Sequence, residues 1–343
     1  MRFEYTRQGL TGNEYILERA FEMLPGMFSW SVLIAVALLS FLQPLIAAGI
    51  IIAFDLYWVL RLFYMNVFLL LSYFILSAEE QTDWMRRIEE LDRKDSLPGV
   101  GWRHLPQYGL RRWISAVKYR RQRQRLFDSG ADVPAGGDIV HAVIIPVVRE
   151  SRAVIEPGIR ALAGGRYPSQ GMVVFIGLEE WALPATRDAV YALQRKYRRY
   201  FHDLIVVEHP GGLPGEARVK GANVTWAARR AAEFFEQRGV RFENVIVSCF
   251  DADTVVHADY FACLTYTFMV TPERTRASYQ PIPVYHNNIW DAPAFARIVD
   301  IGASFFQLIE STDPQTLVTF SSHSMSFKAL VDAGYWPVDM VSD

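Results

Sequence analysis

The apolar segment near the start of the chain restricts the possible folds more than any other part of the sequence. Two uncharged runs, 27–42 and 45–54, are separated only by Gln43-Pro44. A helix needs about 20 predominantly apolar residues to cross the hydrocarbon core of a bilayer. The sequence therefore predicts two membrane helices, at about 24–42 and 45–70, with a turn at Gln43-Pro44.

Two alternatives remain for the segment 27–78. It could be a buried helical hairpin of a soluble protein, or one longer kinked helix followed by a second. Aromatic side chains at Trp30, Tyr57 and Trp58 flank the apolar runs. Trp and Tyr are enriched where membrane helices meet water, so these residues favour a membrane hairpin. The amphipathic segment 1–26 lacks the basic and apolar regions of a cleaved signal peptide.

Positive charge follows this hairpin, in arginine-rich stretches between residues 84 and 125. An excess of Lys and Arg beside a span marks the cytoplasmic side, and a basic helix can lie on anionic lipid. A nucleic-acid patch is the competing interpretation, but the position and the overall net charge of -2 argue against nucleic acid. We expect basic juxtamembrane helices and a linker over 79–137. The protein would then be a multi-pass protein of the cell (cytoplasmic) membrane with both termini in the cytoplasm.

From Asp138 onward, short apolar runs alternate with segments of helical periodicity. This pattern predicts an α/β fold with a mostly parallel sheet flanked by helices. The expected strands are 139–148, 171–178, 203–208 and 244–250, and the expected helices are 152–163, 185–200 and 220–238. The last part is less regular, with strands expected at 276–281 and 317–321 and a helix 326–333 that ends at Gly334.

The length limits the number of structural units, and the cysteine content indicates a reducing compartment. The 343 residues allow about two structural units. Cys249 and Cys263 lie inside apolar stretches. We interpret them as small core residues in a reducing compartment and not as a disulfide.

Two carboxylates, Asp251 and Asp253, come directly after the apolar run at 245–249. Ligands of open α/β sheets bind at the carboxyl ends of the strands. Carboxylate oxygens are hard ligands that suit Mg²⁺ or Mn²⁺, which would carry the phosphates of a substrate. A solvated turn is the alternative for an isolated Asp-X-Asp sequence.

Further polar residues follow the other predicted strands. Glu150 comes after the first strand and Glu179 after the second. Acids at successive strand ends would converge on one crevice of a parallel sheet. Lys220 and Asn223 open the predicted long helix, where a cation and a helix N-terminus suit a phosphate. The alternatives are solvated loop acids and an ordinary helix start.

Four elements occur in the order found in membrane-anchored family 2 glycosyltransferases with a GT-A (Rossmann-like) fold, which the chain resembles over 138–343. The first is the strand with Pro146 and Glu150, and the second is the segment 214–223, which contains Pro-Gly-Glu and Lys-Gly-x-Asn. The third is Asp251-Ala252-Asp253. The fourth is the segment 328–339, which matches the helix, Gly and Trp that precede the family's catalytic acid.

The resemblance implies roles for these residues. Glu150 and Glu179 would contact the nucleoside, Lys220 and Asn223 would lie near the diphosphate or sugar, and Asp251 and Asp253 would hold metal and donor. On the acceptor side we expect His286, Asn287 and Trp336. A loop hydrogen bond for His286 and a core position for Trp336 are the alternatives.

The sequence departs from the family pattern at three places. Val-Val-Arg-Glu at 147–150 replaces a Tyr-Asn-Glu-like segment, and Ser-Ser-His-Ser at 321–324 replaces a glycine-rich acceptor segment. The family's catalytic base belongs to a Thr-Glu-Asp-like motif, which Val341-Ser342-Asp343 matches only in part. Asp343 is therefore the base or its neighbour, and we expect the catalytic domain 138–343 to be incomplete at its C-terminus.

The resemblance implies a metal-dependent, inverting hexosyltransferase-type enzyme. It would move a sugar from a nucleotide-sugar donor to a lipid-linked or polysaccharide acceptor at the membrane, in polysaccharide biosynthesis, with the catalytic domain facing the cytoplasm. One alternative is an inactive membrane scaffold that binds nucleotide. Another is a nucleotidyltransferase, which would need a glycine-rich basic loop after the first strand, and 146–152 contains no glycine.

Overall fold

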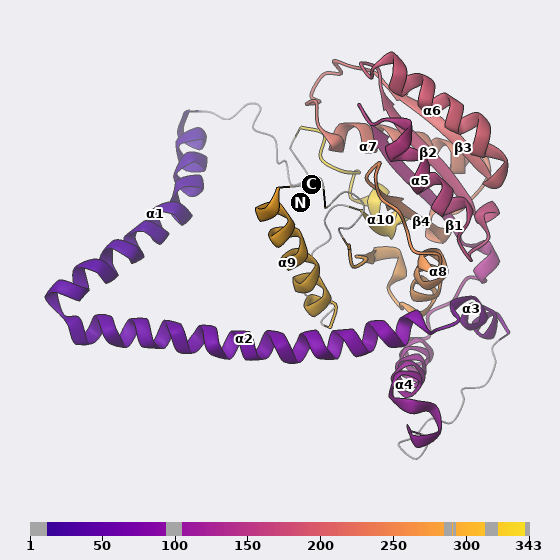
Figure 1. The fold of residues 1–343 in the computed structure, drawn as a ribbon. Helices are drawn as coiled ribbons and strands as arrows, with labels where there is room; N and C mark the ends of the chain where they lie inside the picture. Colours follow the sequence, from indigo (N-terminus) through magenta and orange to yellow (C-terminus); the bar gives the residue numbers. More distant parts are fainter. Residues whose placement is uncertain (1–11, 94–104, 285–289, 291–292, 313–321, 340–343) are drawn as a thin grey trace. The chain divides into compact units, whose positions relative to one another are not determined.

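The computed structural model describes residues 12–93, 105–284, 290, 293–312 and 322–339 (Figure 1). The chain divides into two compact units, Met1–Ser72 and Tyr73–Asp343. The first contains most of the apolar segment, and the second contains the α/β domain.

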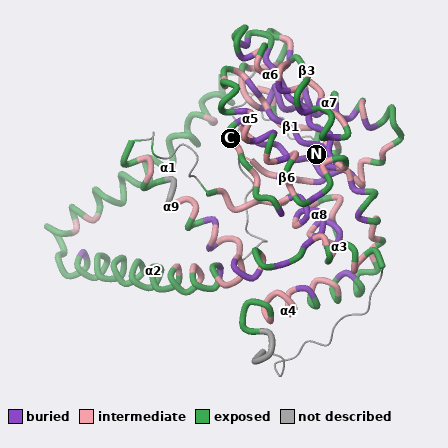
Figure 2. The backbone as a smooth tube through the Cα atoms, turned by 45° about the vertical axis from the view of Figure 1, so that its right-hand side comes forward, coloured by how far each residue is buried: buried purple, intermediate pink, exposed green. Residues whose placement is uncertain are grey.

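The first unit is formed by α1 (Gly12–Leu42) and the greater part of α2 (Pro44–Glu80). α1 ends at Leu42 and α2 begins at Pro44, which confirms the predicted turn at Gln43-Pro44. Proline favours this break because it has no backbone N–H to continue a helix. Both helices are long and apolar enough to span a membrane by length and composition. Most of their residues are exposed (Figure 2), and Phe41 and Leu45 are each 88% accessible. The helices extend beyond the apolar runs, because polar residues at 12–22 and 77–80 also adopt helical conformation.

The second unit is built on a six-stranded sheet with the order β3-β2-β1-β4-β6-β5. β1 pairs in parallel with β2 and β4, and β2 pairs in parallel with β3. β6 is antiparallel to both β4 and β5. The predicted α/β fold class with a mostly parallel sheet is therefore confirmed. The strands are β1 (Val140–Val147), β2 (Met172–Glu179), β3 (Asp203–His209), β4 (Val245–Cys249), β5 (Ser278–Tyr279) and β6 (His323–Ser326).

Helices cover both faces of this sheet, which is why its central strands are apolar on both sides. Successive side chains of β1 point to opposite faces. Val143 and Ile145 belong to one core cluster, whereas Ala142 and Ile144 belong to the other. The first cluster includes α5 (Arg152–Ala163), α6 (Pro184–Tyr197) and α8 (Tyr260–Val270), and the second includes α7 (Lys220–Gln237) and α10 (Phe327–Asp332).

The C-terminal third differs most from the sequence prediction. The predictions do not include α8 or α9 (Ala294–Glu310). The predicted strand 317–321 lies outside the described residues, and the last described strand begins at His323. β5 covers only two of the residues predicted at 276–281. The predicted helix 326–333 is present as α10, and the Ser326 side chain accepts a hydrogen bond from Ala329 N at its start.

Two helices precede the sheet in the second unit. They are α3 (Trp84–Asp92) and α4 (Leu105–Ser129), and both contact α8. α4 contains a kink at Gly109, whose backbone is not helical. The predicted basic segment therefore forms helices that pack against the α/β domain.

Candidate functional site

A cavity of about 400 Å³ lies at the carboxyl ends of the parallel strands. It falls between β1 and β4, where the strand order reverses, which is the usual ligand position in open α/β sheets. The structure brings six predicted site residues to its wall. These are Glu150, Glu179, Lys220, Asn223, Asp251 and Asp253.

Lys220 and Asp251 join the start of α7 to the loop that follows β4. Lys220 Nζ lies 2.5 Å from Asp251 Oδ1, and both side chains are partly exposed to the cavity. The same loop is held by the residue before β6, because Ser322 Oγ accepts a hydrogen bond from Asp251 N at 3.3 Å and lies 2.7 Å from Thr254 Oγ1. The loop therefore has a defined path beneath the two aspartates.

Gly158 on α5 also fixes this loop. A Cβ atom at residue 158 would lie 2.7 Å from the carbonyl oxygen of Thr254. Real Cβ atoms essentially never approach a heavy atom below 3.0 Å. A glycine is therefore required for α5 to pack directly against the backbone of the aspartate loop.

Glu150 closes the end of β1. Its Oε2 accepts hydrogen bonds from Val148 N at 2.6 Å and Arg149 N at 2.9 Å. These two backbone donors hold the carboxylate in one position at the cavity wall.

Glu179 at the end of β2 is held by Asn223 from the first turn of α7. Asn223 Nδ2 donates to Glu179 Oε1 and to the Gly177 carbonyl, each at 3.1 Å. Asn223 is only 1% exposed. A Cβ atom at residue 177 would lie 2.0 Å from Asn223 Oδ1, so the absence of a side chain at Gly177 allows α7 to approach β2.

A buried carboxylate–imidazole–carboxylate chain extends from Glu179, and sequence reasoning did not predict it. His209 Nδ1 lies 2.9 Å from Glu179 Oε2, and His209 Nε2 lies 3.0 Å from Glu216 Oε2. The three side chains are 7%, 7% and 12% exposed in the order His209, Glu179, Glu216. Since a carboxylate only accepts hydrogen bonds, both contacts require either a doubly protonated imidazole or a protonated acid. The chain links β2 and β3 to the loop before Lys220.

Trp181 is a second feature of the site that sequence reasoning missed. Its ring lines the cavity beside Glu179, and it is 39% exposed. The guanidinium carbons of Arg149 and Arg218 each lie 5.9 Å from its ring centroid, within cation–π range. The position of Trp181 directly after the acids at the end of β2 was the available sequence signal.

Three of the predicted acceptor-side and catalytic residues, His286, Asn287 and Asp343, lie outside the described residues. Trp336 packs against the core cluster formed with α7 and α10. Its carbonyl accepts a hydrogen bond from Thr225 Oγ1 at 2.9 Å, and its ring lies 6.1 Å from that of His323. Burial and the nearby charge of Lys220 lower the pKa of His323, while Asp251 opposes the shift.

The aspartate pair fits a divalent cation that also binds a substrate. Among the residues whose positions are described, no group of three or more His, Cys, Asp or Glu side chains could enclose a metal. Asp251 and Asp253 both line the cavity, however, and Mg²⁺ is commonly held by one or two carboxylates together with water and substrate phosphates. The neighbouring Cys249 does not line this cavity, and burial raises the pKa of its thiol to about 12.

Comparisons with known proteins give weak likenesses. No protein-family model matches the sequence, and the comparison with curated proteins finds no match. Among solved structures, the mannosyltransferase PcManGT from Pyrobaculum calidifontis, in complex with GDP-Man and Mn²⁺, is similar with 17% identity and a TM-score of 0.40, covering 67% of this chain and 59% of that one. TarS 1–349 of S. aureus has 14% identity and a TM-score of 0.35, covering 60% and 52%. This chain thus spans less than two thirds of either protein.

Proposed function

We propose that this protein is a metal-dependent, inverting glycosyltransferase of the cell membrane. It would transfer a hexose from a nucleotide-sugar donor to a lipid-linked or polysaccharide acceptor. The observation that carries this proposal is the composition of one cavity. Asp251 and Asp253 on one loop, Lys220 at a helix start and the carboxylates of Glu150 and Glu179 all line it.

The diphosphate of the donor would lie against Asp251, Asp253 and Lys220. The two carboxylates would hold Mg²⁺ or Mn²⁺, which when bound neutralises charge that develops on the leaving diphosphate. Lys220 Nζ, now paired with Asp251, would donate to a phosphate oxygen. Glycine at Gly158 and the contacts of Ser322 keep the aspartate loop in place during this step.

The nucleoside would occupy the other side of the cavity. The carboxylates of Glu150 and Glu179 accept hydrogen bonds and would therefore select N–H or O–H groups of the base or ribose. Trp181 offers an aromatic face beside them, and Arg149 and Arg218 would contribute positive charge around this ring. His209 and Asn223 would keep the Glu179 side chain oriented.

The acceptor would approach from the C-terminal part of the domain. We keep His286, Asn287 and Trp336 as predicted acceptor-side residues. A carboxylate at or next to Asp343 would take the proton of the acceptor hydroxyl as general base. Attack opposite the leaving diphosphate then inverts the configuration of the sugar.

The membrane part of the proposal concerns the N-terminal helices. Segment 1–26 would precede a membrane hairpin at 27–78, followed by the basic segment 79–137 and the catalytic domain 138–343. α1 and α2 are long and apolar enough to span a bilayer. Positive charge directly after α2 would retain the catalytic domain in the cytoplasm.

Transfer activity of the full-length protein in proteoliposomes tests this proposal. A panel of UDP-, GDP- and dTDP-sugars would be assayed with Mn²⁺ and with chelator. Asp253→Asn should lower metal-dependent transfer at least about 100-fold, because it removes one ligand charge at the leaving group. The matched control is Asp188→Asn, an exposed residue of α6.

The outcomes separate the candidates. Unchanged metal-dependent transfer by the Asp253→Asn protein would refute the assignment of the aspartate pair. Tight nucleotide binding without transfer to any acceptor would favour the scaffold, and release of pyrophosphate from a nucleoside triphosphate would favour a nucleotidyltransferase.

A further inference from the structure

Helix α4 carries a concentration of positive charge. It contains seven basic residues and one acidic residue, for a net charge of +6. Arg111, Arg112, Arg121 and Arg125 are exposed. Within the described part of the chain, none of these four guanidinium groups forms an ion pair or hydrogen bond. Such a surface attracts a partner with many negative charges.

The remaining surface of α4 is attached to the α/β domain. Tyr119 is buried and donates a hydrogen bond to Glu90 Oε2 on α3 at 2.8 Å. Tyr266 on α8 donates to Gln122 Oε1 at 2.9 Å. These contacts hold α4 against α3 and α8, while the four arginine side chains remain exposed.

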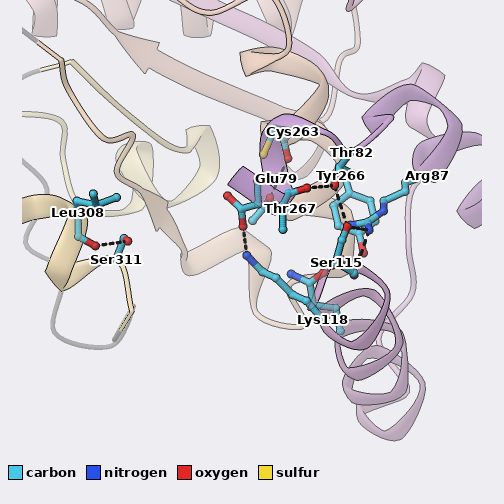
Figure 3. A network of polar contacts seen from close by, with 12 residues as sticks. Glu79, Thr82, Arg87, Ser115, Lys118, Cys263, Tyr266, Thr267, Leu308 and Ser311 are labelled. Carbon is cyan, nitrogen blue, oxygen red and sulfur yellow. Dashed lines mark hydrogen bonds and ion pairs between the residues drawn. The ribbon is translucent and has the colours of Figure 1, made fainter. Parts of the chain in front are cut away.

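The end of α2 lies against the same helix (Figure 3). Lys118 of α4 forms an ion pair with Glu79 in the last turn of α2. Immediately after α2, Thr82 Oγ1 lies 2.8 Å from Ser115 Oγ. The middle of α4, at Ser115 and Lys118, therefore lies beside the end of the apolar helix α2.

Arg87 contacts three elements at this junction. Its guanidinium carbon lies 5.1, 4.8 and 5.5 Å from the ring centroids of Trp84, Tyr119 and Tyr266. Arg87 also donates to Ser115 Oγ at 2.6 Å and to the Ser115 carbonyl at 3.1 Å. α3, α4 and α8 thus meet at one partly buried cation.

We propose that Arg111, Arg112, Arg121 and Arg125 bind the anionic phospholipid headgroups of the leaflet from which α2 emerges. The bilayer is the partner because α2 is apolar enough to cross it, and its last turns are in contact with α4. A basic residue near an anionic leaflet increases the local binding equilibrium by about fivefold. The inference rests on the membrane insertion in the proposed function, and it is independent of the reaction.

Amide hydrogen exchange of the full-length chain in lipid nanodiscs tests this contact. Discs of phosphatidylcholine alone are compared with discs that also contain phosphatidylglycerol. Peptides from 110–125 should exchange about tenfold more slowly in the anionic discs at low salt, and the difference should shrink at high salt. Peptides from α6 should exchange equally in both and serve as the internal reference.

Two variants make the test specific. Substitution of the four α4 arginines by Gln should remove the difference between the discs. A control with the same change in charge should retain it, and it replaces the exposed residues Arg195, Arg199, Arg238 and Arg241 by Gln.

Equal exchange of 110–125 in both discs, with the chain incorporated, would overturn the lipid contact and leave the proposed function standing. A chain that does not co-purify with either disc would overturn both. If added RNA slows exchange in the zwitterionic discs while phosphatidylglycerol has no effect, α4 is a nucleic-acid surface and the proposal is wrong.

Discussion

Gly177→Ala should disturb the donor side of the cavity although residue 177 contributes no side chain to it. The new Cβ atom would lie 2.0 Å from Asn223 Oδ1, and real contacts stay above 3.0 Å, so one group must move by about 1 Å. Asn223 cannot move freely, because Nδ2 holds both the Gly177 carbonyl and Glu179 Oε1.

The cost follows from these contacts. Overpacking of a tight interior costs about 1–3 kcal/mol. Loss of the hydrogen bond from Asn223 to the Glu179 carboxylate adds about 1.5–3 kcal/mol. We therefore expect Gly177→Ala to lower the stability of the domain by about 3–5 kcal/mol, a drop of about 10 °C in melting temperature. Asn223→Ala alone should cost about 2 kcal/mol, because it loses the hydrogen bonds but leaves no steric overlap.

A double-mutant cycle measures the coupling between residues 177 and 223. Melting temperatures of the detergent-solubilised full-length chain would be recorded for both single variants and the double variant. The double variant should be more stable than the sum of the single effects predicts by about 3–5 kcal/mol, since Asn223→Ala removes both the oxygen atom that the new Cβ atom at residue 177 would meet and the hydrogen bond to Glu179 that Gly177→Ala would break. Gly137→Ala is the control, because a Cβ atom at that position meets nothing within 4 Å. Strict additivity, or an unchanged melting temperature for Gly177→Ala, would refute this reasoning.

Three further changes test other parts of the domain. Gly158→Ala should weaken Mn²⁺ binding in the presence of nucleotide, because its Cβ atom would meet Thr254 O at 2.7 Å, whereas Gly302→Ala has open space and should have no effect. Burial lowers the pKa of His141 to about 3. Between about pH 6.5 and pH 3 the unfolded chain binds a proton at His141 that the folded chain does not bind. The free energy of unfolding is therefore unaffected by His141 above about pH 6.5 and decreases by up to about 1.4 kcal/mol per pH unit as the pH falls toward 3. His141→Gln should make the melting temperature depend less on pH in this range. Arg87→Lys should destabilise the domain by about 2 kcal/mol, since an ammonium cannot reproduce the stacked, forked contacts, while Arg86→Lys on the exposed side of α3 should be neutral in the same melting assay.

Sequence reasoning succeeded where the signal was a short apolar run. The first four strands were predicted to within one or two residues, because each is a short apolar run bounded by polar residues, although only β1, β2 and β4 are buried on both faces and the edge strand β3 is partly exposed. The convergence of Glu150, Glu179 and Asp251 followed from the parallel order alone. The turn at Gln43-Pro44 followed from the chemistry of proline.

The missed features depend on register and packing. Glu179 and His209 are direct partners in the pairing of β2 with β3, and no local pattern encodes which residues of two strands face each other. The two arginines over the Trp181 ring, Arg149 and Arg218, belong to two loops that only the folded sheet brings together. α8 was missed because it is buried on nearly all sides and shows almost no amphipathic periodicity.

Binding of Mn²⁺ by the full-length chain, followed by the electron paramagnetic resonance signal of free hexaaquo Mn²⁺, tests the central claim most directly. With a nucleoside diphosphate present, the chain should remove one equivalent of free Mn²⁺. Asp251→Asn and Asp253→Asn should each weaken this binding at least about tenfold, while the exposed control Asp188→Asn should not. Equal Mn²⁺ binding by the wild-type and Asp253→Asn proteins, or no binding with any nucleotide, would contradict a metal-dependent donor site in this cavity.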